Sequence, residues 1–579
     1  MSFVKLSVQR GSKSTVEVFR GYNHNLRIGD GELYDMKNMT SDAYPLLSPR
    51  EARVCTVTAE NPVRGVACLD GLCYVEGNTL HYGEGKTVSL ALTDGEKQLV
   101  PFGAFLIILP DRLWVNTVTG ESGACERRSQ FQGSFGVVWC MEDGTPYETV
   151  VTSETAPENT VQMWVQGSTL MGWNETLKAW TEVKPSYLKL IGDGVGMDFE
   201  KGDKLCIQEE QVHEKVELSA LFGFGENQVI AKDRDWLVFE GAMEHTRVEL
   251  EDRQFELIAK MPMMDFVFEH ENRLWGCRYG LNNNGEFVNE IYASALGDFK
   301  RWYSYQGVST DSYTASCGTD GKWTGAIKAL GYPLFFKENY LHKVYGSYPA
   351  NYQIQVTPCN GVREGSEKSL VVVDGVLYYH GLSGVYAYDG SLPVCVSEDL
   401  GTERYAQAVA GRKESKYYIS MADGSEDSVL FCYDTQKRLW HKEDGLSVRQ
   451  FATVGRALHY ITGDEAVYAI GGEGSLIEKN IPWFAETGLL GLGDSEHKYI
   501  LSLSVRLSAS FGTQLRFYVQ YDSSQDWLHI GSFSGVGTDS VHLPMRIRRC
   551  DHLRLRIEGE GDAKFYSMTI TTEKGSDIR

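Results

Sequence analysis

The sequence predicts an all-β protein: a β-propeller of six or seven blades, with an inserted small β domain and a C-terminal β-sandwich of jelly-roll type. Three observations support this fold class. The 579 residues include 60 glycines and 31 tyrosines, a balance that favours turns and strands. A turn-then-strand pattern recurs at intervals near 40 residues. Near the C-terminus, apolar and polar residues alternate with the period of a half-buried strand.

The recurring pattern is a polar turn followed by Leu or Tyr and an aromatic residue. Its first residues lie at seven positions: Asp70, Asp111, Asn272, Asn339, Asp374, Ser415 and Arg456. Four of the six intervals are close to the length of a four-stranded blade, and the sheets need stacking to cover their apolar faces. We interpret the 67 residues between Asn272 and Asn339 as one long blade. The alternative is an ordinary β-sandwich with coincidental spacing.

Two further β units are expected beside the blades. The interval from Asp111 to Asn272 exceeds one blade by about 120 residues, and its short strands with Gly/Asp turns predict an inserted barrel or sandwich. Strands at 500–507, 514–521 and 553–557 predict the C-terminal sandwich. The expected organisation is an N-terminal arm and first strand (1–60), first blades (61–130), the inserted domain (131–260), remaining blades (261–482), and a connector with the C-terminal sandwich (483–579).

The net charge of −22 argues against a protein that grips nucleic acid through its phosphates. The negative charge can be interpreted as serving solubility. A more specific interpretation is that it forms an acidic wall that repels DNA sliding past it. No apolar run approaches the ~18 residues that would span a bilayer, and the first residues lack a signal peptide's apolar segment. The twelve scattered cysteines are expected to be reduced and mostly buried.

No residue is predicted to be catalytic, to bind a cofactor or to bind a metal. The segment Gly192–Gly196 lacks the following helix that phosphate binding requires, so we expect a hairpin loop. Segments 318–323 and 521–527 miss the Asp-box spacing and are expected to be hairpin turns. The histidines stand singly, and the 78 acids single out no catalytic pair.

The aromatic residues of the C-terminal unit raise the question of a sugar-binding platform. They lie on or next to one alternating strand: Phe517, Tyr518, Tyr521 and Trp527. Because their spacing follows the strand, core packing is the expected role.

Three stretches together resemble bacteriophage virion proteins. The opening segment, with Asp30-Gly31-Glu32, Asp35–Met39 and Pro45–Arg50, resembles the N-terminal region of the tail nozzle, or packaged-DNA stabilisation, proteins of short-tailed phages. The middle, with Trp180 and 186–190, and the C-terminal stretches 549–559 and 575–577 are similar to phage proteins from Gram-positive hosts.

The resemblance implies a structural tail protein of the virion that is assembled in the host cytoplasm and is not an enzyme. It implies a ring, usually a hexamer, below the portal and its adaptor, which retains double-stranded DNA and passes it during ejection without tight binding. Acidic lumen loops and basic subunit contacts are expected. The alternatives are a receptor- or glycan-binding protein at the distal tail, and a propeller glycosidase or lyase acting on cell-wall polymer.

The opening segment, residues 25–53, is expected to be an extended arm. Pro45 and Pro49 exclude a continuous helix and disfavour an internal strand position. The arm would run along the propeller or a neighbouring subunit, and Val54–Val57 would begin the first blade. The alternative is that the arm closes the ring within its own propeller.

Overall fold

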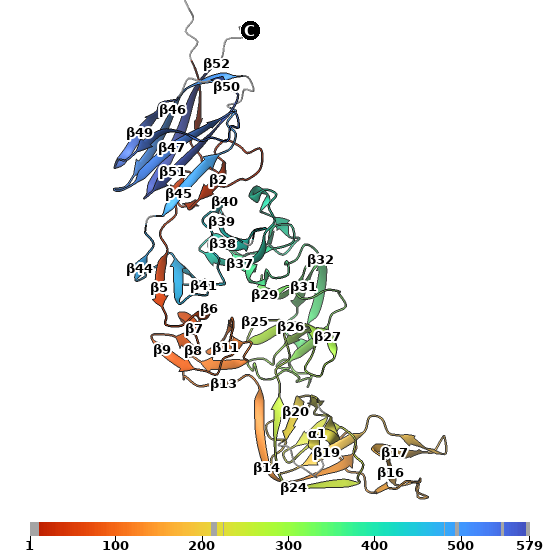
Figure 1. Ribbon diagram of the computed structural model, residues 1–579. Coiled ribbons are helices and arrows are strands. Elements are labelled where there is room, and N and C mark those ends of the chain that lie inside the picture. Colours follow the sequence, from red (N-terminus) through yellow and green to blue (C-terminus); the bar gives the residue numbers. More distant parts are fainter. Residues whose placement is uncertain are drawn as a thin grey trace, which may run out of the picture. The chain divides into compact units, whose positions relative to one another are not determined.

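The computed structural model describes seven stretches of the chain: residues 11–209, 217–223, 225–425, 427–479, 481–491, 497–545 and 549–574. These residues form strands, turns and short helices, with α1 (Leu218–Phe222) as their only α-helix (Figure 1). The predicted all-β class is confirmed. No described helix has the length and hydropathy needed to cross a bilayer. Residues 575–577 of the phage resemblance, and part of the predicted connector, lie outside these stretches.

The chain divides into two compact units. Unit 1 comprises Met1–Lys97, Phe336–Leu341 and Pro358–Arg579, and unit 2 comprises Gln98–Phe335 and His342–Thr357. The domain boundaries expected from the sequence stay predictions.

Unit 1 contains four sheets of the propeller type, in which hairpins join successive antiparallel strands. Three are four-stranded: β6 (Val63–Cys68), β7 (Leu72–Glu76), β8 (Thr79–Tyr82) and β9 (Lys86–Ser89); β33 (Val371–Val373), β34 (Val376–His380), β35 (Val385–Tyr388) and β36 (Val394–Cys395); β37 (Ala406–Lys413), β38 (Lys416–Ala422), β39 (Ser428–Asp434) and β40 (Leu439–Lys442). The fourth contains β41 (Gln450–Val454), β42 (Ala457–Ile461), β43 (Ala466–Ile470), β5 (Val54–Thr58) and β44 (Leu476–Ile477).

The first strands of these sheets, β33, β37, β41 and β6, lie beside one another in that order. Apolar side chains fill the space between neighbouring sheets, as Tyr418, Leu430 and Leu458 do between the β37 and β41 sheets. Stacking therefore covers the face that a single sheet would leave in water.

Three more sheets have the same strand order. They contain β10 (Gln98–Phe102), β11 (Phe105–Leu109), β12 (Leu113–Asn116) and β13 (Ser122–Ala124); β25 (Phe266–His270), β26 (Arg273–Leu281), β27 (Phe287–Ala293) and β28 (Tyr313–Ser316); β29 (Gly325–Ala329), β30 (Tyr332–Lys337), β31 (Tyr340–Tyr345) and β32 (Gln353–Pro358). The described residues thus contain seven sheets of blade type, and the predicted propeller of six or seven blades is confirmed.

The turn-then-strand pattern marks two different hairpins. At Asp70, Asn272 and Asp374 it precedes the second strand of a sheet, whereas at Asp111 and Asn339 it precedes the third. The interpretation of the interval from Asn272 to Asn339 as one long blade is therefore wrong, because the interval joins two sheets at different hairpins. Asp70 and Asp374 have φ values of 53° and 49°, a left-handed conformation that Asp and Asn tolerate better than most residues.

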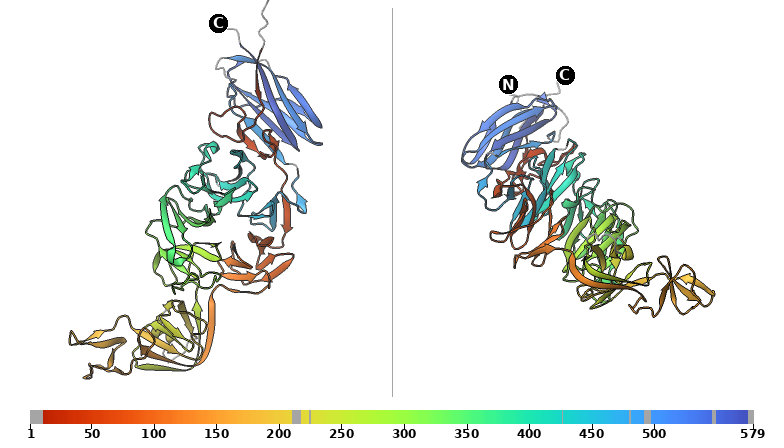
Figure 2. Two further views of the ribbon diagram at one scale, coloured as in Figure 1. Left: turned by 180° about the vertical axis from the view of Figure 1, so that it is seen from behind. Right: turned by 60° about the horizontal axis from the view of Figure 1, so that its bottom comes forward.

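The strand expected to begin the first blade belongs to the last sheet instead. In β5, Val54 lies opposite Ala469 of β43 and Ile477 of β44. Figures 1 and 2 show this N-terminal strand among the late strands of the chain. The arm therefore closes its own propeller, which was the alternative. The sequence pattern could not decide this, because the same apolar strand fits the edge of either sheet.

The inserted unit is built on two long antiparallel strands, β14 (Arg127–Cys140) and β24 (Arg247–Ala259). They lie at the centre of a seven-stranded sheet with β19 (Tyr187–Ile191), β20 (Lys204–Glu209), β21 (Asn227–Gln228), β22 (Ala231–Asp233) and β23 (Trp236–Glu240). A smaller sheet contains β15 (Val150–Thr152), β16 (Met163–Gln166), β17 (Thr169–Asn174) and β18 (Ala179–Glu182). The predicted β insertion is confirmed.

The C-terminal unit is a sandwich of two five-stranded sheets, as predicted. One contains β1 (Ser12–Val16), β52 (Ala563–Lys574), β46 (Lys498–Ala509), β49 (Gly537–Leu543) and β50 (Arg549–Cys550); the other contains β2 (Leu33–Lys37), β45 (Pro482–Thr487), β51 (Leu553–Glu560), β47 (Gln514–Tyr521) and β48 (Leu528–Phe533). Leu503, Leu515 and Leu555 are buried between them.

The first forty residues contribute a strand to each sheet of the sandwich. β1 pairs with β52, from Ser12 opposite Thr572 to Val16 opposite Met568, and β2 pairs with β45 (Figures 1 and 2). A short pair, β3 (Met39–Thr40) and β4 (Ser48–Pro49), leads from there to β5. Both ends of the chain therefore build one sandwich, which the sequence analysis did not foresee.

Candidate functional site

The glycine-rich segment Gly192–Gly196 joins β19 to β20. The segment is a loop, as predicted, but not a hairpin, because β14 and β24 lie between those strands in the sheet. The Gly194 amide donates to Asp235 Oδ1 at 2.9 Å. At Gly196, a Cβ would lie 2.0 Å from the Asp233 carbonyl oxygen. The loop backbone lies so close to the segment at Asp233–Asp235 that a side chain at Gly196 would not fit.

The two Asp-box-like segments have different roles. Residues 318–323 connect β28 to β29, which belong to different sheets, so the hairpin prediction is wrong there. Trp323 is buried and packs edge-on against Phe335, with ring centroids 6.0 Å apart, which anchors the connection. Residues 521–527 join the neighbouring antiparallel strands β47 and β48, so the hairpin prediction is confirmed there.

The aromatic residues of the C-terminal unit are partly core residues. Phe517 and Tyr521 are buried in the sandwich, as predicted. Tyr518 contacts His529, and Trp527 lies 6.0 Å from the Arg556 guanidinium, so these two form no continuous platform with the buried pair.

Burial of cysteines agrees with the expectation of small apolar side chains. Cys73, Cys125, Cys140 and Cys432 are buried, and desolvation raises the pKa of each thiol. Cys68, on the strand next to Cys73, is exposed.

The arm is fastened by a buried ionic cluster, here termed the N-terminal clamp: Arg50, Arg53, Glu443, Asp444 and Glu478. The two arginine side chains are only 4% and 7% exposed. Arg53 donates to Glu443 Oε2 at 2.7 Å and to Asp444 Oδ2 at 2.8 Å. Arg50 donates to Glu478 Oε2 at 2.8 Å. The clamp joins the residues before β5 to those after β40 and β44.

Mutual attraction in the clamp outweighs desolvation. Burial alone would lower the pKa of Arg53, but the Glu443 and Asp444 carboxylates raise it. Burial would likewise raise the pKa of Asp444 and Glu478, but bonds and charge from the arginines lower both. Every charged side chain of the clamp faces one of opposite charge, and only the Arg53 Nε among its buried nitrogens lacks a hydrogen bond, which suits a structural joint rather than a reactive centre.

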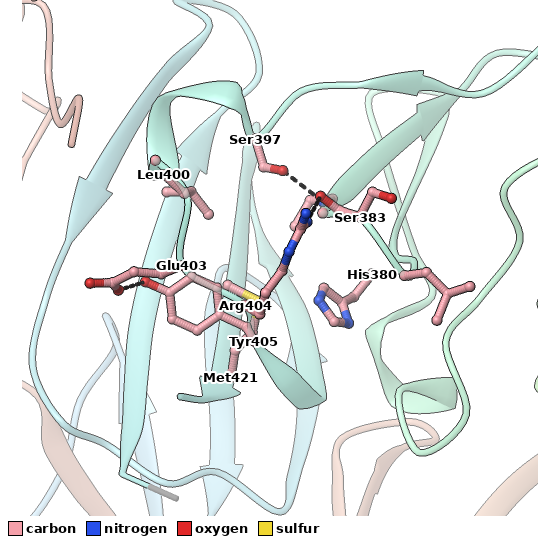
Figure 3. Close-up of a pocket in the computed structure, with 12 residues that line it drawn as sticks. His380, Ser383, Ser397, Leu400, Glu403, Arg404, Tyr405 and Met421 are labelled. Carbon is pink, nitrogen blue, oxygen red and sulfur yellow. Dashed lines mark hydrogen bonds between the residues drawn. The ribbon is translucent and has the colours of Figure 1, made fainter. Parts of the chain in front are cut away.

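A water-sized cavity between β34 and the segment before β37 is shown in Figure 3. His380 at its wall bonds to Ser366 Oγ through Nδ1 at 3.1 Å, and burial followed by the charge of a nearby arginine lowers its pKa to about 4. The Tyr405 hydroxyl donates to Glu403 Oε2 at 2.7 Å, while Arg404 donates to a backbone carbonyl. A volume of about 20 Å³ admits one water and no substrate.

A groove of about 620 Å³ lies in unit 1 where the arm passes the sandwich. Phe511 in its lining is 94% exposed, whereas Trp483 is buried. Carboxylates of Glu51, Glu560 and Asp562 also line it. The groove combines an exposed aromatic ring with an acidic border.

One group of potential metal ligands is found among the described residues: Asp522, Asp551 and His552. The Asp551 amide donates to Asp522 Oδ1 at 2.9 Å. His552 Nδ1 lies 2.5 Å from Asp551 Oδ1, and its Nε2 lies 2.7 Å from Ser523 Oγ. Because both ring nitrogens already contact the chain, the group is explained as a hydrogen-bonded turn.

A polar cavity larger than the one beside His380 opens where inner strands of the propeller begin. It measures about 400 Å³, and its lining includes Glu96, Glu367, Lys368, Gln407 and Arg449. Glu367 and Lys368 lie in the 3-10 helix η2 (Glu367–Ser369) before β33, and Arg449 directly precedes β41. Because β33, β37 and β41 lie side by side, residues that begin them meet here. We term this space the inner-strand cavity.

The charges of the inner-strand cavity are only half paired. Lys368 Nζ lies 2.5 Å from Glu96 Oε2 and donates to the Arg449 carbonyl at 3.2 Å. Within the part of the chain that the structure describes, no side-chain partner is found for Glu367 or for the Arg449 guanidinium. The cavity therefore presents a negatively charged acceptor, the Glu367 carboxylate, and a positively charged donor, the Arg449 guanidinium.

Gln407 lies in an unusual backbone conformation at the lining of the same cavity. Its φ is 49°, and the pairing of β37 with β38 shifts register between Ala406 and Val409. A left-handed non-glycine residue costs about 1 kcal/mol, and bulges often redirect side chains next to binding sites. No sequence pattern indicated this cavity, because its residues come from segments far apart in the chain.

Comparisons with known proteins give distant structural neighbours. No protein-family model and no curated protein sequence matches the chain. A glycoside hydrolase family 43 arabinoxylan arabinofuranohydrolase from Bacillus subtilis is 9% identical, with a TM-score of 0.18 over 53% of this chain and 95% of that chain. Trypanosoma rangeli sialidase is 9% identical, with a TM-score of 0.19 over 96% of each chain. Another glycoside hydrolase is 11% identical, with a TM-score of 0.20 over 52% and 96%.

The prediction that the chain is not an enzyme is contradicted by these neighbours, which are enzymes. The expectation rested on the phage resemblance and on the lack of a catalytic spacing in the sequence. In a propeller, side chains that meet in one cavity come from different sheets, so sequence spacing does not reveal them. The low identities and TM-scores assign no activity or substrate to this chain.

Proposed function

We propose that the chain is a structural protein of a bacteriophage tail, a ring-forming nozzle or channel subunit below the portal and its adaptor. The observation that carries the proposal is the interlocking of the termini. Residues 12–58 supply strands to both sheets of the sandwich and to the last propeller sheet, and the clamp fastens the segment before β5. Such closure resists forced opening, since the edge strands are paired within the chain.

Charge supports the same proposal. A channel that passes duplex DNA works best when its wall makes few phosphate contacts, because each contact adds affinity and slows transit. The net charge of −22 meets that requirement. In the phage proteins that the sequence resembles, the ring is usually a hexamer. A ring of this chain would place acidic loops toward the lumen and basic residues toward neighbouring subunits.

The test is immunogold labelling of intact virions from the source, using an antibody raised against residues 131–260. Antibody preabsorbed with the purified chain is the control. Label in a ring directly below the head supports the proposal. Label nowhere on the particle contradicts it.

The second candidate is a receptor- or glycan-binding protein at the distal tail. The inner-strand cavity favours it, because that cavity is large enough for a small ligand and keeps unpaired polar groups. The same labelling experiment separates the two candidates, since label at the distal tip or on fibres would support host recognition.

A further inference from the structure

The lining of the inner-strand cavity restricts the chemistry of its ligand. Its volume of about 400 Å³ lies in the range of small-molecule sites. The carboxylates of Glu96 and Glu367 are balanced by Lys368 and Arg449, so neither an anion nor a cation is favoured by net charge. The lining contains no aromatic ring, which disfavours a flat apolar ligand.

The free polar groups match a ligand with many hydroxyls. Glu367 is an unpaired acceptor, Arg449 carries unpaired donors, and the exposed Gln407 amide offers both. Serine hydroxyls at Ser428 and Ser447 add further groups of both kinds. Hydrogen bonds to charged side chains are the stronger kind, and their strength does not require a charged ligand.

We propose that the inner-strand cavity binds a neutral saccharide, whose hydroxyls donate to Glu367 and accept from Arg449 and Gln407. The left-handed backbone at Gln407 interrupts the pairing of β37 with β38 and places the Gln407 amide at the cavity. The Glu96–Lys368 ion pair forms part of the wall. This site deepens the second candidate function, a receptor- or glycan-binding protein, and does not rest on the proposed ring role.

The experiment is saturation-transfer NMR on the purified full chain, with glucose, galactose, N-acetylglucosamine and lactose as separate probes at millimolar concentration. Glucuronate and inorganic phosphate, the latter followed by phosphorus line width, serve as charged probes. The variants are Glu367→Gln and Arg449→Gln, and the matched control is Glu84→Gln in the exposed turn after β8. Circular dichroism melting checks that each variant folds.

We expect transfer to at least one neutral saccharide, and affinity about tenfold to a hundredfold weaker in each cavity variant but unchanged in the control. Three outcomes overturn the proposal: no transfer to any of the four saccharides, transfer that survives both cavity variants, or binding of phosphate or glucuronate alone. If a charge variant melts early, Gln407→Ala replaces it and must weaken saccharide binding. Virion labelling is unaffected by any of these results, so the two proposals can fail separately.

Discussion

The N-terminal clamp and the inner-strand cavity contain the same kinds of charged groups in opposite states. In the clamp, Arg50 and Arg53 are nearly inaccessible and bonded to carboxylates. In the cavity, Arg449 is exposed and without a described partner, and Glu367 is half-buried and likewise without one. Both regions join segments that are distant in the sequence. They differ in how completely the chain satisfies its own charges.

This difference separates a structural joint from a binding site. A buried ion pair is costly to break, because the remaining charge stays desolvated. An unpaired charge in an open cavity is hydrated, so its removal costs the fold little but leaves a ligand without its contact. Stability measurements should therefore respond to the clamp, and binding measurements to the cavity.

Glu443→Gln should have the largest effect on stability. The substitution keeps the side-chain shape but removes the charge that faces Arg53 at 2.7 Å and Arg50 at 3.5 Å. We expect a loss of about 2–3 kcal/mol in the free energy of unfolding, because a buried charge-assisted contact is lost while Arg53 keeps Asp444 and Arg50 keeps Glu478. Urea denaturation followed by tryptophan fluorescence measures it. A loss below about 1 kcal/mol would show that the clamp is hydrated in solution.

Acid should weaken the clamp by a smaller amount. The folded-state pKa values of Asp444 and Glu478 are lowered, so their contribution is fully present above the unfolded values of about 3.9 and 4.3. It is lost as the pH falls through the lowered folded values. The effect is smaller than that of Glu443→Gln because both side chains are partly exposed, at 21% and 33%.

The measurement is the urea midpoint from about pH 6 to about pH 3, for the native chain and for Asp444→Asn with Glu478→Gln. The double variant should have a lower urea midpoint at about pH 6, and its midpoint should fall less than that of the native chain on acidification. Contributions from buried histidines such as His380 are common to both proteins and cancel in the difference. If the urea midpoints of both proteins fell equally with pH, the result would contradict the assigned role of these two carboxylates.

The sequence predicted regions in which local pattern determines structure. Turn residues such as Asp70 and Asp374 must tolerate a left-handed backbone, and the apolar alternation of 514–521 fixes one buried face. Both are properties of neighbouring residues. The propeller repeat, the insertion and the sandwich were therefore recognisable without any structure.

The sequence could not predict pairings between distant segments. β5 pairs with strands more than 400 residues later, and nothing in Val54–Thr58 distinguishes the first sheet from the last. For the same reason, the sequence did not reveal that β1 and β2 belong to the sandwich. It also did not reveal the inner-strand cavity, because Glu96, Glu367 and Arg449 meet only when three inner strands lie side by side. The site was missed because it has no local signature.

Gln407 offers a test in which stability and binding should change in opposite directions. Gln407→Gly removes the cost of a left-handed side-chain-bearing residue, so we expect a gain of about 0.5–1 kcal/mol in the free energy of unfolding. Gln407→Ala keeps the Cβ and should leave stability nearly unchanged. Both should weaken saccharide binding equally, since both lack the amide. A loss of stability in the glycine variant would show that the backbone there is not strained.

The smallest expected effect is the coupling between Glu367 and Arg449. Double-mutant cycles with the Gln variants isolate the pairwise energy, and the Glu443–Arg53 pair provides the comparison. We expect a coupling of less than about 0.5 kcal/mol for the cavity pair and several times more for the clamp pair. A cavity coupling above about 1 kcal/mol would mean that the two side chains bond to each other in solution. The cavity would then resemble the clamp, and a ligand would have to break that bond before it could bind.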